Sequence, residues 1–187
     1  MPVYFVAPVI GGPVRIGYSE APKHRLAGLL AWSPYELQIL ATLDGGFLLE
    51  AWFLHRFRAH KHRGDWHKPE FPVIEAAHLI ATTGAYPGAP VGDDRYIRLP
   101  RLSIDTVALA DYFGLTEATF AAGLGMLPQS FGNWRHGSFG DAAAGTVLSL
   151  AHQMGVLLTI EGFEIFRRPR KQKPAPDVEP PREASAA

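Results

Sequence analysis

The chain has 187 residues, of which 47% are hydrophobic and 19% charged, so its length suits one or two domains, each with a hydrophobic core. Its 18 Lys and Arg residues balance its 18 Asp and Glu residues. This balance excludes a uniformly basic nucleic-acid coat or an acidic tail, and any charged binding surface must be local. The absence of cysteine excludes a disulfide scaffold, a Cys-based zinc finger and a Cys nucleophile.

Composition divides the chain into four zones. Residues 1–84 mix strand and helix patterns, and residues 85–101 are rich in Pro and Gly, which predicts a linker. Residues 102–166 are rich in Ala, Leu and Gly and predict helices, whereas residues 167–187 are basic and Pro-rich and predict a disordered tail. The chain is therefore expected to be an α+β protein with domains at 1–84 and 102–166.

The first zone opens with a predicted hairpin. Residues 3–6 and 13–18 are rich in β-branched and aromatic side chains and flank a Gly-Gly-Pro turn. Leucines at helical spacing predict a helix over residues 23–32, with Ser19 as its N-cap and Pro22 in its first turn.

The rest of this zone predicts one strand and two helices. Residues 37–43 alternate as a strand and end at an Asp-Gly-Gly turn, and residues 47–60 and 72–83 show helical spacing. The order ββαβα plus a helix predicts a small mixed sheet with helices packed against it.

Three polar side chains in this zone suit phosphodiester hydrolysis. Tyr4 lies on the first predicted strand, Arg25 on the first helix and Glu50 on the long helix. The glutamate can hold a divalent cation, the arginine can bind phosphoryl charge, and the tyrosine can orient or deprotonate water. The alternative is that the tyrosine packs in the core and the other two side chains are solvated.

Five separated segments carry a family resemblance: VYFV, RIGYS, Arg25-Leu26, LLEAWFLHRF and GDWH. In this order they resemble the GIY-YIG nuclease superfamily, closest to its phage-T5-like branch, over residues 2–80. The resemblance implies a DNA-cleaving endonuclease that uses a divalent metal, expected to be Mg²⁺.

The resemblance also implies roles for single residues. Tyr4 matches the tyrosine of GIY, and Ile16-Gly17 matches the second half of YIG. Arg25 matches the active-site arginine, Glu50 the metal-binding glutamate, and His55 the histidine of this branch.

The sequence departs from the family pattern at two places. Arg15 stands where YIG has its tyrosine, and Tyr18 is expected to compensate in part. The closing GEWF pattern appears as GDWH, residues 64–67. The departures leave open an inactive DNA-binding regulator that keeps the nuclease fold as a scaffold.

Residues 55–68 form a basic, histidine-rich stretch with five Lys or Arg and one Asp. Beside a phosphate site it suits contact with the DNA backbone, for which we expect Arg15, Arg56, Lys61 and Arg63. Two alternatives are a solvated helix end and a zinc site. The zinc ligands would be His55, His60, His62 and His67.

Residues 120–137 predict two short helices joined by a turn at Gly125, with Phe131 and Trp134 facing inward. The segment is similar to Cro/repressor-type helix-turn-helix domains, which implies such a domain over residues 104–155, with further helices at 104–113 and 141–154. The residues expected to contact DNA are Gln129, Ser130, Asn133 and Arg135.

Other interpretations of this half stay open. Residues 109–120 offer a competing helix-turn-helix register, and an ordinary helical bundle without a DNA role is the alternative to both. Because repressor-type modules often pair on palindromic DNA, a homodimer is a further expectation. Residues 156–166 are rich in β-branched side chains and predict a hairpin or edge strand.

Two further expectations concern membranes and protein partners. The N-terminus lacks the basic flank and unbroken apolar run of a signal peptide, and His152 and Gln153 interrupt the longest apolar stretch. We therefore expect a cytoplasmic protein with no membrane partner. A third functional class is a protein-interaction module whose apolar surface combines Trp32, Trp52 and Trp66.

Overall fold

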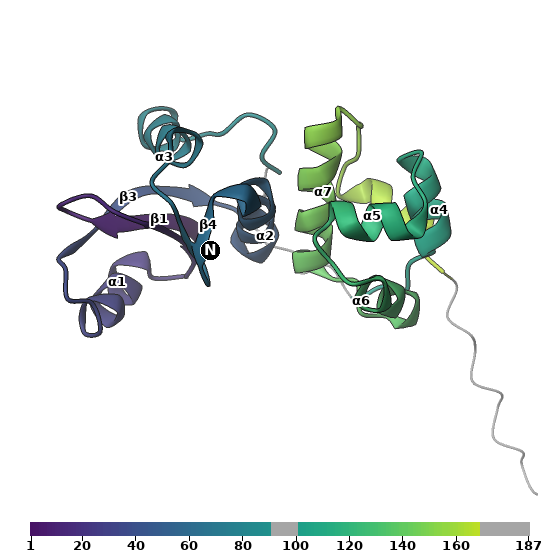
Figure 1. Cartoon of the computed structure of the whole chain (residues 1–187), viewed down its shortest axis with the longest axis horizontal. Coiled ribbons are helices and arrows are strands. Elements are labelled where there is room, and N and C mark those ends of the chain that lie inside the picture. The colour runs from purple at the N-terminus through teal and green to yellow at the C-terminus, as the bar shows by residue number, and fades with distance from the viewer. Residues whose placement is uncertain (91–100, 169–187) are drawn as a thin grey trace, which may run out of the picture.

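A computed structural model describes residues 1–90 and 101–168 and has the expected α+β class. In Figure 1 a small sheet with its helices occupies one half of the molecule, and helices alone form the other. One continuous cluster of buried side chains runs through both halves.

The sheet contains five strands in the order β3-β1-β2-β5-β4. They are β1 (Pro2–Pro8), β2 (Val14–Tyr18), β3 (Leu37–Asp44), β4 (Lys61–Arg63) and β5 (Trp66–His67). The predicted hairpin and third strand are confirmed. All described strand pairings are antiparallel, so the expectation of a mixed sheet is wrong. Strands β2 and β3 run in the same direction, but they lie on opposite sides of β1 and do not pair.

Alternation along β1 gives the sheet two different faces. Val3 and Phe5 belong to the main core, whereas Tyr4 and Val6 belong to a smaller cluster on the opposite face. Helix α1 (Pro22–Leu30) covers the Tyr4 face and helix α3 (Phe71–Thr83) covers the other (Figure 1). Both helices agree with prediction, although Ser19 does not cap α1 as its N-cap residue. Its Oγ accepts a hydrogen bond from the backbone N–H of Ala21, which is the N-cap.

The predicted helix over 47–60 is shorter than expected. Helix α2 (Gly46–Arg56) gives way to a 3₁₀ turn, η1 (Arg58–His60), and the chain then forms the β4–β5 hairpin. The hairpin turns at Gly64, which has φ 55°, and β5 pairs with β2. The basic stretch is therefore a strand hairpin at the sheet edge as well as a helix end.

The second half is helical up to Met154, as expected. Its helices are α4 (Thr106–Tyr112), α5 (Glu117–Gly123), α6 (Pro128–Gly132), the 3₁₀ turn η2 (Asn133–His136) and α7 (Asp141–Met154). The prediction of a hairpin or edge strand over 156–166 is wrong, because this segment ends in the 3₁₀ helix η3 (Glu161–Phe166). Three-residue spacing places Phe163 and Phe166 on one buried face.

The first residues of the expected linker, 85–101, and of the expected tail, 167–187, pack against the rest of the structure. Tyr86 lies with its ring 5.8 Å from that of Trp52 and 5.4 Å from that of Phe53. Arg168 donates a backbone hydrogen bond to Ser103, next to a β-bridge between Ile104 and Arg167. The remaining parts of these two expected segments, 91–100 and 169–187, lie outside the described residues.

In the part of the chain that the structure describes, no helix combines the length and apolarity that a membrane crossing requires.

Candidate functional site

Tyr4 is the centre of the candidate site and is 2% exposed. It pairs with Gly17 of β2, and its side chain lies directly over that glycine. A Cβ atom at position 17 would stand 2.6 Å from the Tyr4 hydroxyl oxygen. The glycine of the RIGYS segment is therefore required because the tyrosine packs against bare backbone.

Glu50 reaches the same end of β2 from helix α2. The backbone N–H of Ile16 donates to Asp65 across the edge of β2 that faces β5. Amides two residues apart point to the same side of a strand, so the N–H of Tyr18 also points to this edge, past the last paired residue of β5. The Glu50 carboxylate accepts a hydrogen bond from that N–H. Tyr4 and Glu50 thus meet adjacent residues of one strand.

The electrostatic surroundings of Glu50 are unusual for a glutamate on a helix. Burial and the neighbouring Asp65 carboxylate raise its pKa from 4.5 to about 7, and the Tyr18 hydrogen bond and the Arg15 charge offset only part of this. Carboxyl groups with pKa values displaced toward neutrality are common at catalytic and binding sites. The raised pKa makes this edge of the sheet a candidate for cation or proton chemistry.

Arg15 and Asp65 flank this carboxylate. Arg15 Nη2 lies 3.1 Å from Asp65 Oδ2, and its guanidinium lies 6.0 Å from the centre of the Trp66 ring. Sequence reasoning did not select Asp65 as a site residue. The signal that could have found it was its place in the GDWH segment, which closes the family resemblance.

Arg25 lies on the helix that covers Tyr4. Its neighbour Leu26 packs against the Tyr4 cluster, while Arg25 itself is exposed. Within residues 1–90 and 101–168, no hydrogen bond or ion pair holds its guanidinium. The side chain is available for an external anion on the same face of the sheet as Tyr4.

The structure does not bring His55 to this group. It is buried at the contact between α2 and α5, where its Nε2 lies 3.2 Å from the Gly123 carbonyl oxygen and contacts Arg58. Burial, followed by the Arg58 charge, lowers its pKa to about 4, so the ring is neutral at pH 7. Tyr18 contributes its backbone N–H to Glu50, and its ring packs 4.1 Å from that of Phe47.

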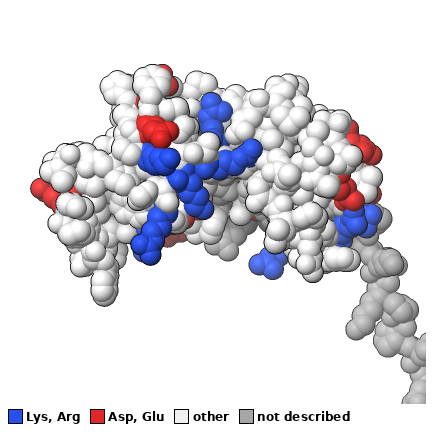
Figure 2. Space-filling view, in the orientation of Figure 1, with Lys and Arg blue, Asp and Glu red and all other residues white. Residues whose placement is uncertain are grey.

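The basic residues near the site divide into held and free side chains. The Nε of Arg56 donates to the Tyr86 hydroxyl at 3.2 Å, and its guanidinium lies over Trp52. Lys61 and Arg63 are exposed on β4. Figure 2 shows Lys and Arg side chains gathered on the face where Figure 1 labels β4. Lys61 and Arg63 are therefore better placed than Arg56 to meet an anionic partner.

The histidines of this stretch point to separate places. His60 Nδ1 lies 2.5 Å from Glu70 Oε2, whereas His67 is buried in β5 and His55 contacts Gly123. The described residues contain no group of three His, Asp or Glu side chains arranged to hold a metal.

The expected apolar surface of three tryptophans does not form. Trp52 is fully buried and Trp66 partly buried, and only Trp32 stands in solvent. Trp52 is taken up by the core because α2 packs between the sheet and α7.

Both predicted helix-turn-helix registers, 109–120 and 120–137, have two helices joined at a glycine with positive φ, so secondary structure does not choose between them. Helix α5 is followed by Gly125 with φ 71° and then by α6. Phe131 and Trp134 are buried as expected. Of the four residues expected to contact DNA, Gln129, Ser130 and Asn133 are exposed.

Arg135 differs from these three because it is held inside the module. Its Nε donates to Thr106 Oγ1 at 2.5 Å, and its Nη2 contacts the Glu117 carboxylate. Thr106 in turn donates to the same carboxylate at 2.5 Å. These contacts connect η2 to α4 and α5.

Replacing Arg135 with Ala is expected to lower the free energy of unfolding by about 1–2 kcal/mol, because it removes the charge-assisted hydrogen bond to the fully buried Thr106 and the ion pair with Glu117. Urea titration measures this loss. The matched variant Asn133→Ala should leave stability within about 0.5 kcal/mol, and equal losses from both would contradict the structural role of Arg135.

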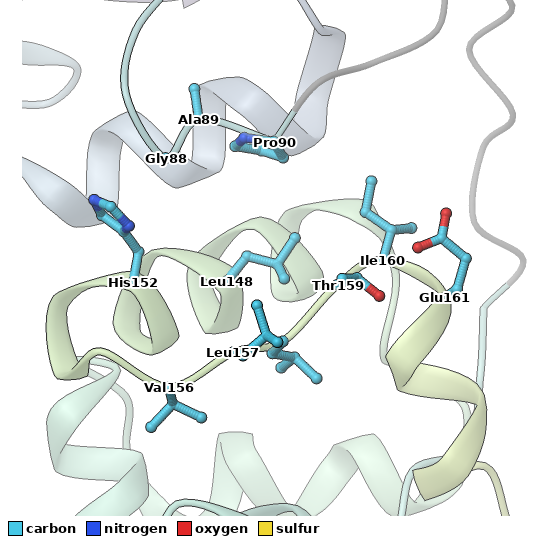
Figure 3. Close-up of a pocket in the computed structure, with 11 residues that line it drawn as sticks. Gly88, Ala89, Pro90, Leu148, His152, Val156, Leu157, Thr159, Ile160 and Glu161 are labelled. Carbon is cyan, nitrogen blue, oxygen red and sulfur yellow. The ribbon is translucent and has the colours of Figure 1, made fainter.

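Two of the hollows on the described surface differ in whether they include predicted site residues. One, of about 370 Å³, lies between α7, residues 156–161 and residues 88–90 (Figure 3). Its walls are mainly aliphatic, and the His152 ring packs tightly against Gly88. It contains none of the predicted site residues. The other, of about 590 Å³, includes Arg15 and Arg63 and lies on the Tyr4 face of the sheet.

Comparisons with protein-family models, curated proteins and solved structures find no significant match to this chain.

Proposed function

We propose that the protein is a metal-dependent endonuclease that hydrolyses phosphodiester bonds in DNA, with the helix-turn-helix module holding the substrate. The observation that carries this proposal is the meeting of Tyr4 and Glu50 on adjacent residues of β2. Arg25 lies on the helix above the Tyr4 face, and the pair of Arg15 and Asp65 lies beside the carboxylate. The family resemblance of residues 2–80 supports the same reading.

The side chains fit a magnesium ion. Glu50 and Asp65 offer carboxylate oxygens, and Mg²⁺ is commonly held by one or two carboxylates with water and substrate phosphate completing the shell. When bound, the cation would polarise the scissile phosphate and stabilise charge on the leaving oxygen.

The remaining steps belong to the chain's own residues. The Tyr4 hydroxyl, which lies over Gly17, would orient the attacking water. The Arg25 guanidinium would bind the phosphoryl oxygens and stabilise the charge that develops on them. Arg15, Lys61 and Arg63 would contact the DNA backbone, while Gln129, Ser130 and Asn133 would face the DNA from the second module.

A catalytically inactive DNA-binding regulator is the second candidate. The observation that favours it is Arg15, which takes the place of the YIG tyrosine and is paired with Asp65. Such a protein would bind DNA without metal. For either function we infer action in the cytoplasm, and the repressor-like module favours a homodimer on palindromic sites.

A cleavage assay tests the proposal. The full chain is incubated with supercoiled plasmid, linear duplex and single-stranded DNA, in Mg²⁺ and in EDTA. We expect cutting of at least one substrate in Mg²⁺ and none in EDTA. Salt-dependent binding with no cutting under any metal condition would favour the regulator and overturn the enzyme.

A further inference from the structure

The groove of about 590 Å³ lies next to the candidate site, on the Tyr4 face of the sheet. Its walls come from the loop after α1, the β1–β2 turn and the β4–β5 hairpin. The walls combine aromatic and basic groups. They are Trp32, Tyr35, Trp66, Arg15, His62 and Arg63.

Two of the aromatic groups in this groove, Trp32 and Tyr35, stand far into solvent. Trp32 is 92% exposed and Tyr35 is 53% exposed. Large apolar side chains that are grouped on a surface and left uncovered commonly mark a binding site. Here they leave two ring systems available for stacking.

The loop that carries these rings is held by hydrogen bonds. The Ser33 hydroxyl donates to the Tyr35 carbonyl at 2.9 Å and accepts from the Tyr35 N–H at 3.1 Å. The Trp32 N–H donates to the Leu29 carbonyl. The N–H of Val9, just before the β1–β2 turn, donates to the Glu36 carbonyl. The rings thus project from a fixed turn, which lowers the entropy cost of stacking a ligand on them.

The charge of the groove suits an anion. Arg63 is exposed on β4 and has no ion pair within the described part of the chain. Arg15 lies over Trp66, and none of the residues that line the groove is acidic. Aromatic rings beside cationic side chains are the arrangement with which proteins bind single-stranded nucleic acid, because bases stack on the rings and phosphates meet the charges.

We infer that this groove binds unpaired nucleotides of a single-stranded or locally opened nucleic acid. Bases stack on Trp32 and Tyr35, and the adjoining phosphates contact Arg63 and His62. The inference rests on the proposed action on DNA and adds the form of the substrate, because bases in an intact duplex have their faces covered by stacking. A proline-rich peptide is the other occupant that aromatic grooves accept, and it is an outcome of the test.

Fluorescence anisotropy in EDTA tests the inference without cleavage. The probes are a labelled 12-nucleotide oligothymidylate and a labelled blunt duplex. Trp32→Ala is expected to weaken binding of the oligothymidylate about 5- to 100-fold and to change duplex binding less than twofold. Trp32→Phe should restore most of the affinity, and Arg63→Gln should lower the salt dependence of binding.

Phe71→Ala is the matched control, since Phe71 is 75% exposed and lies outside the groove. The inference fails if the oligothymidylate does not bind the intact chain, if Trp32→Ala binds it normally, or if a proline-rich peptide occupies the groove and the oligothymidylate does not displace it. If the intact chain still cuts duplex DNA in Mg²⁺, only the groove inference has failed. If it neither binds nor cuts any DNA, the proposed function has failed as well.

Discussion

Glu50→Gln is expected to reduce Mg²⁺-dependent cleavage by about 10²–10³-fold while leaving DNA affinity in EDTA within twofold. The amide keeps the shape of the side chain but loses the negative charge that a magnesium ligand supplies. Single-turnover cleavage of the preferred substrate measures the first effect, and anisotropy with the same DNA measures the second.

The same substitution is expected to stabilise the folded protein at alkaline pH. The pKa of Glu50 is about 7 in the folded state against 4.5 as the ordinary value. Between these values the folded state holds more protons than the unfolded state, so the contribution of Glu50 to stability falls as pH rises from about 4.5 to about 7. Glutamine removes this loss. In EDTA, Glu50→Gln should melt at a higher temperature than the natural chain at pH 8, and the difference should shrink toward zero near pH 4.5.

His55 makes the opposite contribution. Its folded-state pKa of about 4 lies below the ordinary 6.5, so its contribution to stability is lost as pH falls from about 6.5 to about 4. Because His55 is present in both proteins, its contribution cancels in the comparison of Glu50→Gln with the natural chain.

Glu75→Gln on the exposed side of α3 is the control for the loss of a glutamate charge and should leave cleavage unchanged. If Glu50→Gln cuts DNA at the natural rate, the carboxylate has no part in the reaction. If it melts at a lower temperature than the natural chain at pH 8, the hydrogen bond to Tyr18 outweighs desolvation and the carboxylate is structural.

The sequence predicted the elements that are long and periodic. The first hairpin, the third strand, α3 and α7 follow from local patterns, because alternation or helical spacing continues over five or more residues. The turn between α5 and α6 followed from Gly125, whose φ is 71°.

The errors arose where tertiary contacts override local pattern. Strands β4 and β5 have three and two residues, too few for alternation to be visible, and they form because β5 pairs with β2. The β-branched side chains of residues 156–160 are typical of a strand. The next residues nevertheless form η3, because Phe163 and Phe166 are buried in the core.

The candidate site was predictable in part. Tyr4 and Glu50 could be selected from the sequence because their neighbours form a motif. Asp65 reaches the site only because the β4–β5 turn places it beside β2, where its carbonyl accepts from the Ile16 N–H. His55 was assigned to the site, but its side chain is taken by Gly123 of the second half. No local pattern reports a contact between residues 68 positions apart.

Gly145→Ala is expected to lower the free energy of unfolding by about 1–3 kcal/mol, although alanine forms helices better than glycine by about 1 kcal/mol. Helices α2 and α7 cross at this glycine. A Cβ atom there would lie 2.1 Å from the Leu48 carbonyl oxygen and 3.0 Å from Ala51 Cβ, so the backbone of one helix must move. Urea denaturation measures the loss of stability.

Gly28→Ala on α1 is the matched control, because a Cβ atom there meets nothing within 4 Å and the helix propensity of alanine alone should act, stabilising the protein by up to about 1 kcal/mol. Opposite signs for the two substitutions would show that close contact at the α2–α7 crossing, and not helix propensity, sets the cost at position 145. Equal gains would mean that the helices separate freely. Leu48 lies two residues before Glu50 on α2, so a displacement of this helix by Gly145→Ala should also move the Glu50 carboxylate away from the Tyr18 N–H. Cleavage should therefore fall in Gly145→Ala and not in Gly28→Ala.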